Sequence, residues 1–186
     1  YAYQQVMDPP SFPLNPQVIP VITKDRLAWI DDEEYDRGIQ HMEAWSEVAA
    51  QLGWYEYPFG YQYPLPRVYP HLMGELYQYA KEKNVMVHHS DMHQVLGDGP
   101  KPWIMAKLQW DTDADVDALL QEWYERAVGP QAADDLAAYF AIWEHFWTET
   151  IQETGWFQRN KHRTYMAYND YSYLPLAIEE IHQSRD

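Results

Sequence analysis

Residues 84–91 read NVMVHHSD, a stretch that follows a helical pattern and leads into a polar loop. Its first half is apolar and rich in valine, as in a strand, and its second half ends in histidine, serine and aspartate. Residues 53–60, GWYEYPFG, have the same order, a short strand that runs into a loop. We therefore predict two strands that carry polar groups at their carboxyl ends.

Helical patterns separate these two strands from each other and from what precedes them. Apolar residues recur at three- and four-residue spacing over 38–52 and over 71–83. Upstream, 1–7 and 18–23 have the composition of short strands, and 24–37 has that of a polar loop. Strands that alternate with helices in this way predict parallel β-α-β units.

The carboxyl ends of parallel strands are where such folds place their chemistry. Here that rule selects residues 7–10, 23–25, 56–59 and 89–93.

Beyond residue 101 the chain is predicted to be almost wholly helical, with helices at 102–109, 114–127, 131–154 and 174–184. We therefore divide the chain into an alternating α/β part, 1–101, and a helical part, 102–186.

The run WDTDADVD, 110–117, places aspartate at four alternate positions and has two interpretations. Counted from Asp111, a calcium loop would use Asp113, Asp115 and Glu122 at its positions 3, 5 and 12. Position 6 of such a loop is a glycine, and here it is Val116. Helical spacing also begins at Val116, so an aspartate cap on a helix explains the run better, with calcium as the alternative.

Composition excludes several classes of partner. The chain has 186 residues and a formal charge of −16, with 29 acidic against 13 basic side chains, which argues against nucleic acid and anionic membranes. No apolar run is long enough for membrane insertion, and the absence of cysteine excludes disulfides. Because the chain opens on tyrosine rather than methionine, we expect it to be an excised piece of a larger polypeptide.

Aromatic residues are abundant, with 16 Tyr, 9 Trp and 5 Phe, and many fall in the loop-like segments 54–69 and 156–173. Aromatic rings among carboxylates and amides suit the apolar faces and hydroxyls of sugars, although packing beneath long loops explains them as well. The candidates for stacking on sugar rings are Trp29, Trp54, Tyr57 and Tyr61, and those for hydrogen bonding to sugar hydroxyls are His89 and His93.

Two carboxylates follow predicted strands and are candidates for acid/base catalysis. Glycoside hydrolysis requires a pair of carboxyl groups, one of which stays protonated because burial or a like charge raises its pKa. Glu56 and Asp91 are the pair we select, because neighbouring strand ends would bring them to one cleft. The plainer interpretation is a solvated carboxylate at Glu56 and a turn former or helix cap at Asp91.

The hexapeptide HHSDMH, 88–93, also admits a metal-dependent hydrolase as an alternative, since His89, Asp91 and His93 would share one face of an extended strand. The spacing matches no common ligand motif and no second cluster is nearby in sequence. We predict neither a resident metal nor a cofactor.

The segment 102–144, PWIMAKLQWDTDADVDALLQEWYERAVGPQAADDLAAYFAIWE, resembles a bacterial domain of unknown function. That domain occurs in large carbohydrate-active proteins with glycoside-hydrolase-like barrels similar to α-glucuronidases. AKLQWDTDADVDALLQEW and the turn at 128–130 carry the resemblance, and Thr112 stands where the family usually has proline. Upstream, WYEYPFGYQYPLP and NVMVHHSD are similar more weakly, with Val87 in place of a common glycine and Asp91 in place of a glutamate.

This resemblance implies a partial (β/α) TIM-barrel-like segment with parallel strands. Residues 1–101 would be the C-terminal part of the barrel, and 102–186 a helical extension packed on it. The remaining strands would come from the rest of a larger polypeptide or from another chain, since a full barrel takes ~250 residues. The expected function is a glycoside-hydrolase-like domain that acts on or binds polysaccharide, outside the cell or in the periplasm. The alternative is a non-catalytic carbohydrate-binding or scaffolding module.

Overall fold

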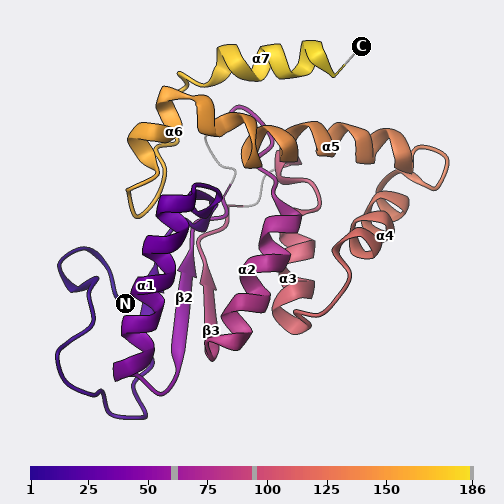
Figure 1. The fold of residues 1–186 in the computed structure, drawn as a ribbon. Helices are drawn as coiled ribbons and strands as arrows, with labels where there is room; N and C mark the ends of the chain where they lie inside the picture. The colour runs from indigo at the N-terminus through magenta and orange to yellow at the C-terminus, as the bar shows by residue number, and fades with distance from the viewer. Residues whose placement is uncertain (60–62, 94–95, 185–186) are drawn as a thin grey trace.

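The protein is a mixed α/β domain, seen in a computed structural model that describes residues 1–59, 63–93 and 96–184. Three strands, β1 (Val21–Thr23), β2 (Leu52–Glu56) and β3 (Val85–Ser90), form one parallel sheet in the order β1-β2-β3 (Figure 1). The α-helices are α1 (Asp32–Val48), α2 (Pro70–Glu82), α3 (Lys101–Trp110), α4 (Val116–Val128), α5 (Ala133–Thr148), α6 (Gly155–Asn160) and α7 (Leu174–Gln183). Short 3-10 turns lie at Gln4–Val6, Arg26–Ile30, Leu96–Asp98 and Thr150–Glu153. The predicted parallel β-α-β order is confirmed.

Both crossover helices lie on the same face of the sheet. The side chain of Trp54, in the central strand, is fully buried between them. Its indole N–H donates to Met42 Sδ of α1 at 3.3 Å, and its ring stacks on Tyr79 of α2 with centroids 6.4 Å apart. Because strand side chains alternate between faces, the neighbours of Trp54 in β2 point to the opposite face, which neither crossover helix covers.

The N-terminal segment differs from its prediction. Residues 1–7 were expected to form a strand, but only Ala2 pairs with the sheet, in a parallel bridge to Ile22. The Ala2 N–H donates to Val21 O at 2.7 Å, and the chain then turns at Gln4, whose φ is 50°. A non-glycine residue in that region ends the extended conformation, so the predicted strand was wrong beyond its first residues.

Helix α1 begins earlier than the apolar spacing predicted. Asp31 caps it by accepting from the Glu34 N–H at 3.1 Å, and residues 32–34, all acidic, form its first turn. Carboxylates stabilise the positive end of a helix, so this turn forms without an apolar stripe. The interpretation of 24–37 as a loop was therefore wrong from residue 32 onward.

The aspartate-rich run is a helix start, as predicted. Asp115 is the N-cap of α4 and accepts from the Ala118 N–H at 3.0 Å. Asp111 accepts from the Asp113 N–H at 3.1 Å, and the Asp113 carboxylate binds Lys81 at 2.6 Å. The run thus combines a cap, a turn and a surface ion pair.

The predicted helix 131–154 is interrupted. α5 ends at Thr148, a 3-10 turn follows, and Thr154 then caps α6 by accepting from the Phe157 N–H at 3.0 Å. A threonine hydroxyl that caps a new helix competes with continuation of the old one. Helices α5, α6 and α7 lie across the carboxyl end of the sheet, at the top of Figure 1.

Histidine 71 joins α2 to the helical part. His71 Nδ1 lies 2.9 Å from Glu144 Oε2 on α5, and His71 Nε2 lies 3.1 Å from Asp117 Oδ1 on α4. The hydrogen bond to Glu144, ahead of the contact with Asp117, raises the pKa of His71 to about 9. The imidazolium therefore donates to both carboxylates at neutral pH.

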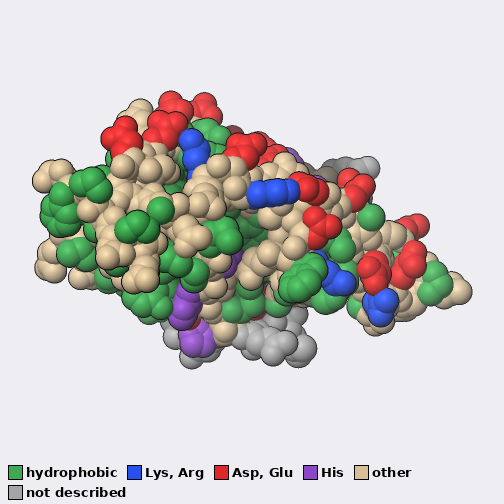
Figure 2. Space-filling model, turned by 90° about the horizontal axis from the view of Figure 1, so that it is seen from below, with side chains coloured by type: hydrophobic (Ala, Val, Ile, Leu, Met, Phe, Trp, Pro, Cys, Tyr) green, Lys and Arg blue, Asp and Glu red, His purple; other side chains and the backbone are tan. Residues whose placement is uncertain are grey.

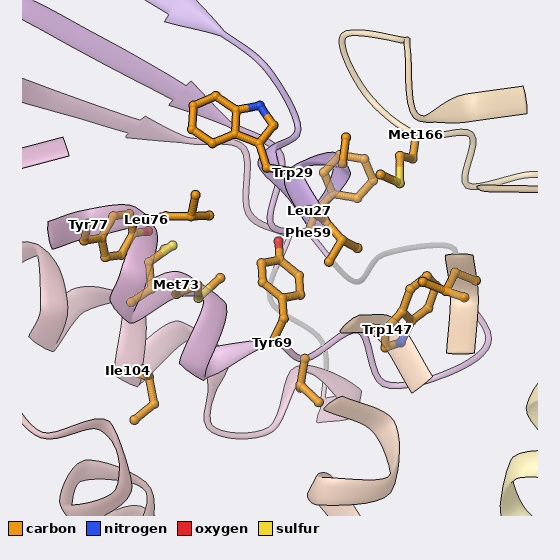
Figure 3. Packing of buried hydrophobic residues seen from close by; sticks show 14 of the residues in the cluster. Leu27, Trp29, Phe59, Tyr69, Met73, Leu76, Tyr77, Ile104, Trp147 and Met166 are labelled. Atoms are coloured by element: carbon orange, nitrogen blue, oxygen red, sulfur yellow. The ribbon is translucent and has the colours of Figure 1, made fainter. Parts of the chain in front are cut away.

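One apolar core runs through both parts of the chain. Figure 3 shows Trp147 and Met166 of the helical part beside Leu27, Phe59 and Tyr69 of the α/β part. The Trp147 indole N–H also donates to Pro66 O at 2.6 Å. The predicted boundary after residue 101 falls at the start of α3, and apolar packing continues across it.

A buried ion pair joins three separate segments at the carboxyl end of the sheet. Asp25, just after β1, binds Arg67 Nη2 with both carboxylate oxygens, at 2.7 and 2.8 Å. Arg67 Nη1 donates to Tyr57 O at 2.7 Å, and the Asp25 N–H donates to Thr164 O at 2.6 Å. Burial lowers the pKa of Arg67, but the Asp25 charge more than offsets it, so the pKa lies above its ordinary value.

Replacement of Asp25 by Asn should destabilise the domain by about 3–5 kcal/mol, because it leaves the Arg67 charge buried without its counter-ion. Urea unfolding followed by tryptophan fluorescence measures the change. Arg126→Gln is the matched control, since it breaks the exposed Arg126–Glu122 pair on α4. It should change the free energy of unfolding by less than about 0.5 kcal/mol. Equal effects of the two variants would contradict this role of Asp25.

Candidate functional site

The face of the sheet that the crossover helices leave open carries aromatic side chains. Tyr55 of β2 and His89 of β3 are in register, and their rings stack with centroids 4.5 Å apart and planes 15° apart. Tyr1 lies against both rings, 5.5 Å from Tyr55 and 6.0 Å from His89, and its hydroxyl is 3.2 Å from His89 Nδ1. The bridge at Ala2 positions Tyr1, because it holds the N-terminal segment alongside β1.

The row of rings continues beyond the carboxyl end of β2. Tyr57 lies 5.1 Å from Tyr55 and 5.3 Å from Tyr165, which belongs to the segment between α6 and α7. We call the open-face cluster the set Tyr1, Tyr55, Tyr57, Phe59, His89, Asp91, His93, Tyr165 and Tyr168. Four regions far apart in the sequence, at residues 1, 55–59, 89–93 and 165–168, thus contribute to one aromatic surface.

Asp91 supplies the carboxylate of this cluster. Its N–H donates to Glu56 O at 2.9 Å, which extends the β2–β3 pairing by one residue, and its carboxylate lies 3.3 Å from His93 Nε2. Burial raises the pKa of Tyr55, and the charge of Asp91 adds to the shift. Burial likewise raises the pKa of Tyr57, with neighbouring phenols and Asp91 contributing. Both phenols therefore keep their protons and can donate as well as accept hydrogen bonds.

Glu56 points to the other face of the sheet, among the helices. Its carboxylate forms a buried ion pair with Arg26, whose guanidinium lies 3.8 Å from the centroid of the Trp54 ring. Burial raises the pKa of Glu56 to about 7, against the opposing effect of the Arg26 charge.

The structure brings Glu56 and Asp91 to adjacent strand ends but not to a common cleft. Glu56 is in register with Ser90, the last residue of β3, so Asp91, which directly follows it and continues the pairing, points to the opposite face. The physical reason is the two-residue period of a strand. The ends of neighbouring strands lie close together, but side chains at odd and even positions point to opposite faces of the sheet.

Of the residues predicted to contact sugar, those on the open face are accessible and the tryptophans are not. His89 and His93 are exposed and Tyr57 is half-buried, all within the open-face cluster. Trp29 and Trp54 are 6 % and 0 % exposed and pack edge to face on each other, with centroids 6.1 Å apart. Neither indole presents a free ring face. Tyr61 lies outside the described residues.

Sequence reasoning missed Tyr1, Tyr55 and Tyr165. Tyr55 had a signal, because it lies two residues before Tyr57 and so shares its face. Tyr165 belongs to the aromatic segment 156–173 that the sequence indicated, but its place beside Tyr57 depends on the packing of the α6–α7 connection, and the position of Tyr1 depends on a bridge to β1. In Figure 2 the Asp and Glu side chains gather mainly along one long margin and at one end, and histidines lie at the opposite margin.

The residues of HHSDMH act in hydrogen bonding and packing. Over the part of the chain that the structure describes, no group of three or more His, Asp or Glu side chains is arranged to hold a metal ion. His88 points to the helix face, where its ring meets Tyr77 edge to face at 5.0 Å. Burial lowers the pKa of His88 to about 4, so it is neutral there.

The fold and the site together define a parallel α/β domain whose sheet has one helix-covered face and one face with an aromatic, carboxylate-bearing cluster. The chain belongs to the family described as Domain of unknown function (DUF4838), whose model matches residues 1–141. No curated protein and no solved structure matches the chain. Among the helices in the described ranges, none has the length and hydropathy to cross a membrane.

The raised pKa of Glu56 predicts a specific pH dependence of stability. A carboxyl whose folded pKa lies above its unfolded value contributes stability below about pH 4.5 that is lost as pH rises through about 7. The free energy of unfolding of the wild type, measured against Glu56→Gln, should therefore fall by on the order of 2 kcal/mol between pH 4 and 7.5. Chemical unfolding at a series of pH values measures this difference.

Glu122→Gln provides the control, since Glu122 is 40 % exposed and pairs with Arg126 at the surface. Its difference from the wild type should stay nearly flat over the same range. A wild-type advantage over Glu56→Gln that grows from pH 4 to 7 would mean that Arg26 outweighs burial, contrary to the assignment.

Proposed function

We propose that this domain binds polysaccharide on the open-face cluster, as part of a glycoside-hydrolase-like architecture. The observation that supports it is the continuous row of rings on a sheet face, with a carboxylate and two imidazoles set among them. Sugar units present apolar ring faces and many hydroxyls, which match aromatic rings and nearby polar atoms respectively. Contiguous exposed apolar patches commonly mark interaction sites or ligand-binding grooves.

The polar groups of the cluster would make different hydrogen bonds to sugar hydroxyls. Asp91 accepts hydrogen bonds, the exposed His89 donates or accepts according to its tautomer, and the phenols of Tyr55 and Tyr57 do both. Tyr1 and Tyr165 are 69 % and 39 % exposed and provide ring area. The row extends over several rings from different segments, an area that favours a chain-like ligand over a single sugar.

Binding without turnover is the form of the proposal that the geometry favours. A glycosidase needs two carboxyl groups about 5–9.5 Å apart across one substrate. Glu56 faces the helices and is bound by Arg26, so only Asp91 of the two selected carboxylates faces the cluster. Hydrolysis at this surface would require a carboxylate other than Glu56 to act together with Asp91.

Tyr165→Ala should weaken polysaccharide binding by about tenfold, because truncating a stacking ring removes on the order of 1.4 kcal/mol. Affinity electrophoresis through gels that contain soluble neutral or acidic polysaccharides measures the retardation. Tyr139→Ala is the matched control, as Tyr139 is 45 % exposed on α5, away from the cluster. Equal retardation of the two variants, or no retardation of the wild type by any polysaccharide, would refute binding at this cluster.

A reducing-sugar assay on the same polysaccharides separates binding from hydrolysis. We expect no turnover. Turnover by the wild type that is lost in both Glu56→Gln and Asp91→Asn would instead support the catalytic pair.

We further propose that the sheet is one segment of a larger barrel, completed by the remainder of a larger polypeptide or by another chain. Successive strands lie next to each other with both crossovers on one face, as in a (β/α) barrel, whereas doubly wound sheets place helices on both faces. Parallel sheets are normally covered on both faces, and in a barrel the open face would line the interior, with Tyr57, Asp91 and Tyr165, beyond the carboxyl ends of the strands, at its mouth. Within the described residues, no strand pairs with the outer edge of β3.

Side chains around the free edge of β3 support this completion. Met86 and Val87 are 61 % and 40 % exposed, and Trp110, at the end of α3, is 93 % exposed. Because the Asp91 N–H points to β2, the alternating amides of His88 and Ser90 point outward from the sheet. An added parallel strand would accept from these amides and cover the apolar side chains.

Hydrogen exchange tests the free edge residue by residue. In the 186-residue chain, the amides of His88 and Ser90 should exchange at least about 100-fold faster than those of His89 and Asp91. In a polypeptide that carries the proposed additional strands, or with a completing chain added, the outward amides should become protected to a similar degree. Outward amides that remain unprotected there would rule out strand addition at β3.

A further inference from the structure

The open-face cluster contains one carboxylate and no permanently charged base. Asp91 is its only acidic member, and none of its members is Lys or Arg. The Asp91 side chain is 34 % exposed, so a ligand can reach the carboxylate while the surrounding protein shields part of it from water. The fixed charge that a ligand meets within the cluster is therefore negative.

The basic side chains that follow β1 lie on the other side of the sheet. Lys24, directly after the strand, binds Glu34 of α1 at 3.1 Å, and Arg26 pairs with the buried Glu56 among the helices. Arg163 is the base nearest in sequence to a member of the cluster. Its carbonyl accepts from Lys24 Nζ at 3.0 Å, which places that part of the backbone near α1. Among the described residues, no Lys or Arg stacks on a ring of the cluster.

The charge of Asp91 acts on the neighbouring rings. Burial raises the pKa of Tyr55, and the Asp91 charge is the next largest cause. Burial also raises the pKa of Tyr57, again with a contribution from Asp91. A ligand group that lies over these two rings would be subject to the same negative charge.

This charge has opposite effects on sugar hydroxyls and on sugar carboxylates. A carboxylate accepts hydrogen bonds from hydroxyls, and such charge-assisted bonds are stronger than those between neutral groups. The carboxylate of a uronic acid would instead meet a like charge, next to ring faces that are themselves negative. The excess of 29 acidic over 13 basic side chains adds repulsion at longer range.

We propose that the open-face cluster takes an uncharged sugar chain and rejects chains of uronic acids, and that Asp91 is the residue that sets this preference. The inference rests on the proposed polysaccharide binding and names its substrate class. Asp91 directly follows the last residue of β3, at the mouth of the proposed barrel, so completion of the sheet would leave it accessible.

Pairs of polymers that share a backbone and differ in charge test the preference. The neutral probes are hydroxyethylcellulose, guar galactomannan and dextran, and their anionic partners are carboxymethylcellulose, carboxymethyl guar and carboxymethyl dextran. Titration calorimetry is done in 0.15 M salt, where the Debye length of about 8 Å screens long-range repulsion, and at pH 8, where imidazoles are largely neutral. The wild type should bind at least one neutral probe, about fivefold more tightly than its anionic partner.

Asp91→Asn should change the two affinities in opposite directions. It should weaken binding of the neutral probe about threefold, because a charge-assisted hydrogen bond is lost, and tighten binding of the anionic partner. Asp135→Asn makes the same change of net charge at an exposed position in the first turn of α5. It should leave both affinities at the wild-type values. The wild-type comparison needs no variant, so the inference stays testable if Asp91→Asn does not fold.

Anionic partners that bind the wild type as tightly as the neutral probes would overturn the inference. So would equal effects of Asp91→Asn and Asp135→Asn, or binding of none of the neutral probes. The proposed function is judged separately, by the loss of retardation in Tyr165→Ala with any polysaccharide. A domain that binds uronic acid chains through Tyr165 would therefore keep the proposed function and refute the charge preference.

Discussion

The ion pair between Asp25 and Arg67 is the constraint on which the arrangement of the domain depends. It joins the end of β1 to the segment after β2, and the backbone of Asp25 is held in turn by Thr164. With both charges excluded from water, neither segment can move away without leaving an unpaired buried charge. The helical part is thereby kept against the carboxyl end of the sheet, and Tyr165, next to Thr164, is kept within the open-face cluster.

Successive side chains of β2 and β3 point to opposite faces of the sheet. The buried Arg26–Glu56 ion pair therefore lies on one face and the exposed aromatic rings lie on the other. Trp54 and Glu56 point to the helices, where Arg26 satisfies a buried carboxylate against an indole ring. Tyr55 and Tyr57 point to the open face and remain accessible with Asp91. One face of the same short strand thus stabilises the fold, and the other leaves rings and hydrogen-bonding groups exposed, which is the basis of the proposed polysaccharide binding.

Sequence patterns predicted the elements best where local chemistry decides them. The start of α4 follows from Asp115 and the apolar spacing after it, and the strand at β3 from a valine-rich stretch with polar residues behind it. The start of α1 was missed because acidic residues and a cap form its first turn without an apolar stripe. Of the candidate site, His89, Asp91 and Tyr57 were selected from sequence, whereas the burial of Trp29 and Trp54 depends on which face the helices cover.

The sequence by itself determined the parallel β-α-β order, the caps, and the polar ends of the strands, because propensity, capping and hydrophobic period act over a few residues. Only the tertiary structure decided that Glu56 and Asp91 face apart and that Tyr1 and Tyr165 join one surface. These outcomes depend on which faces of distant elements come together. Such long-range packing is set by the whole core and leaves no signal within any one segment.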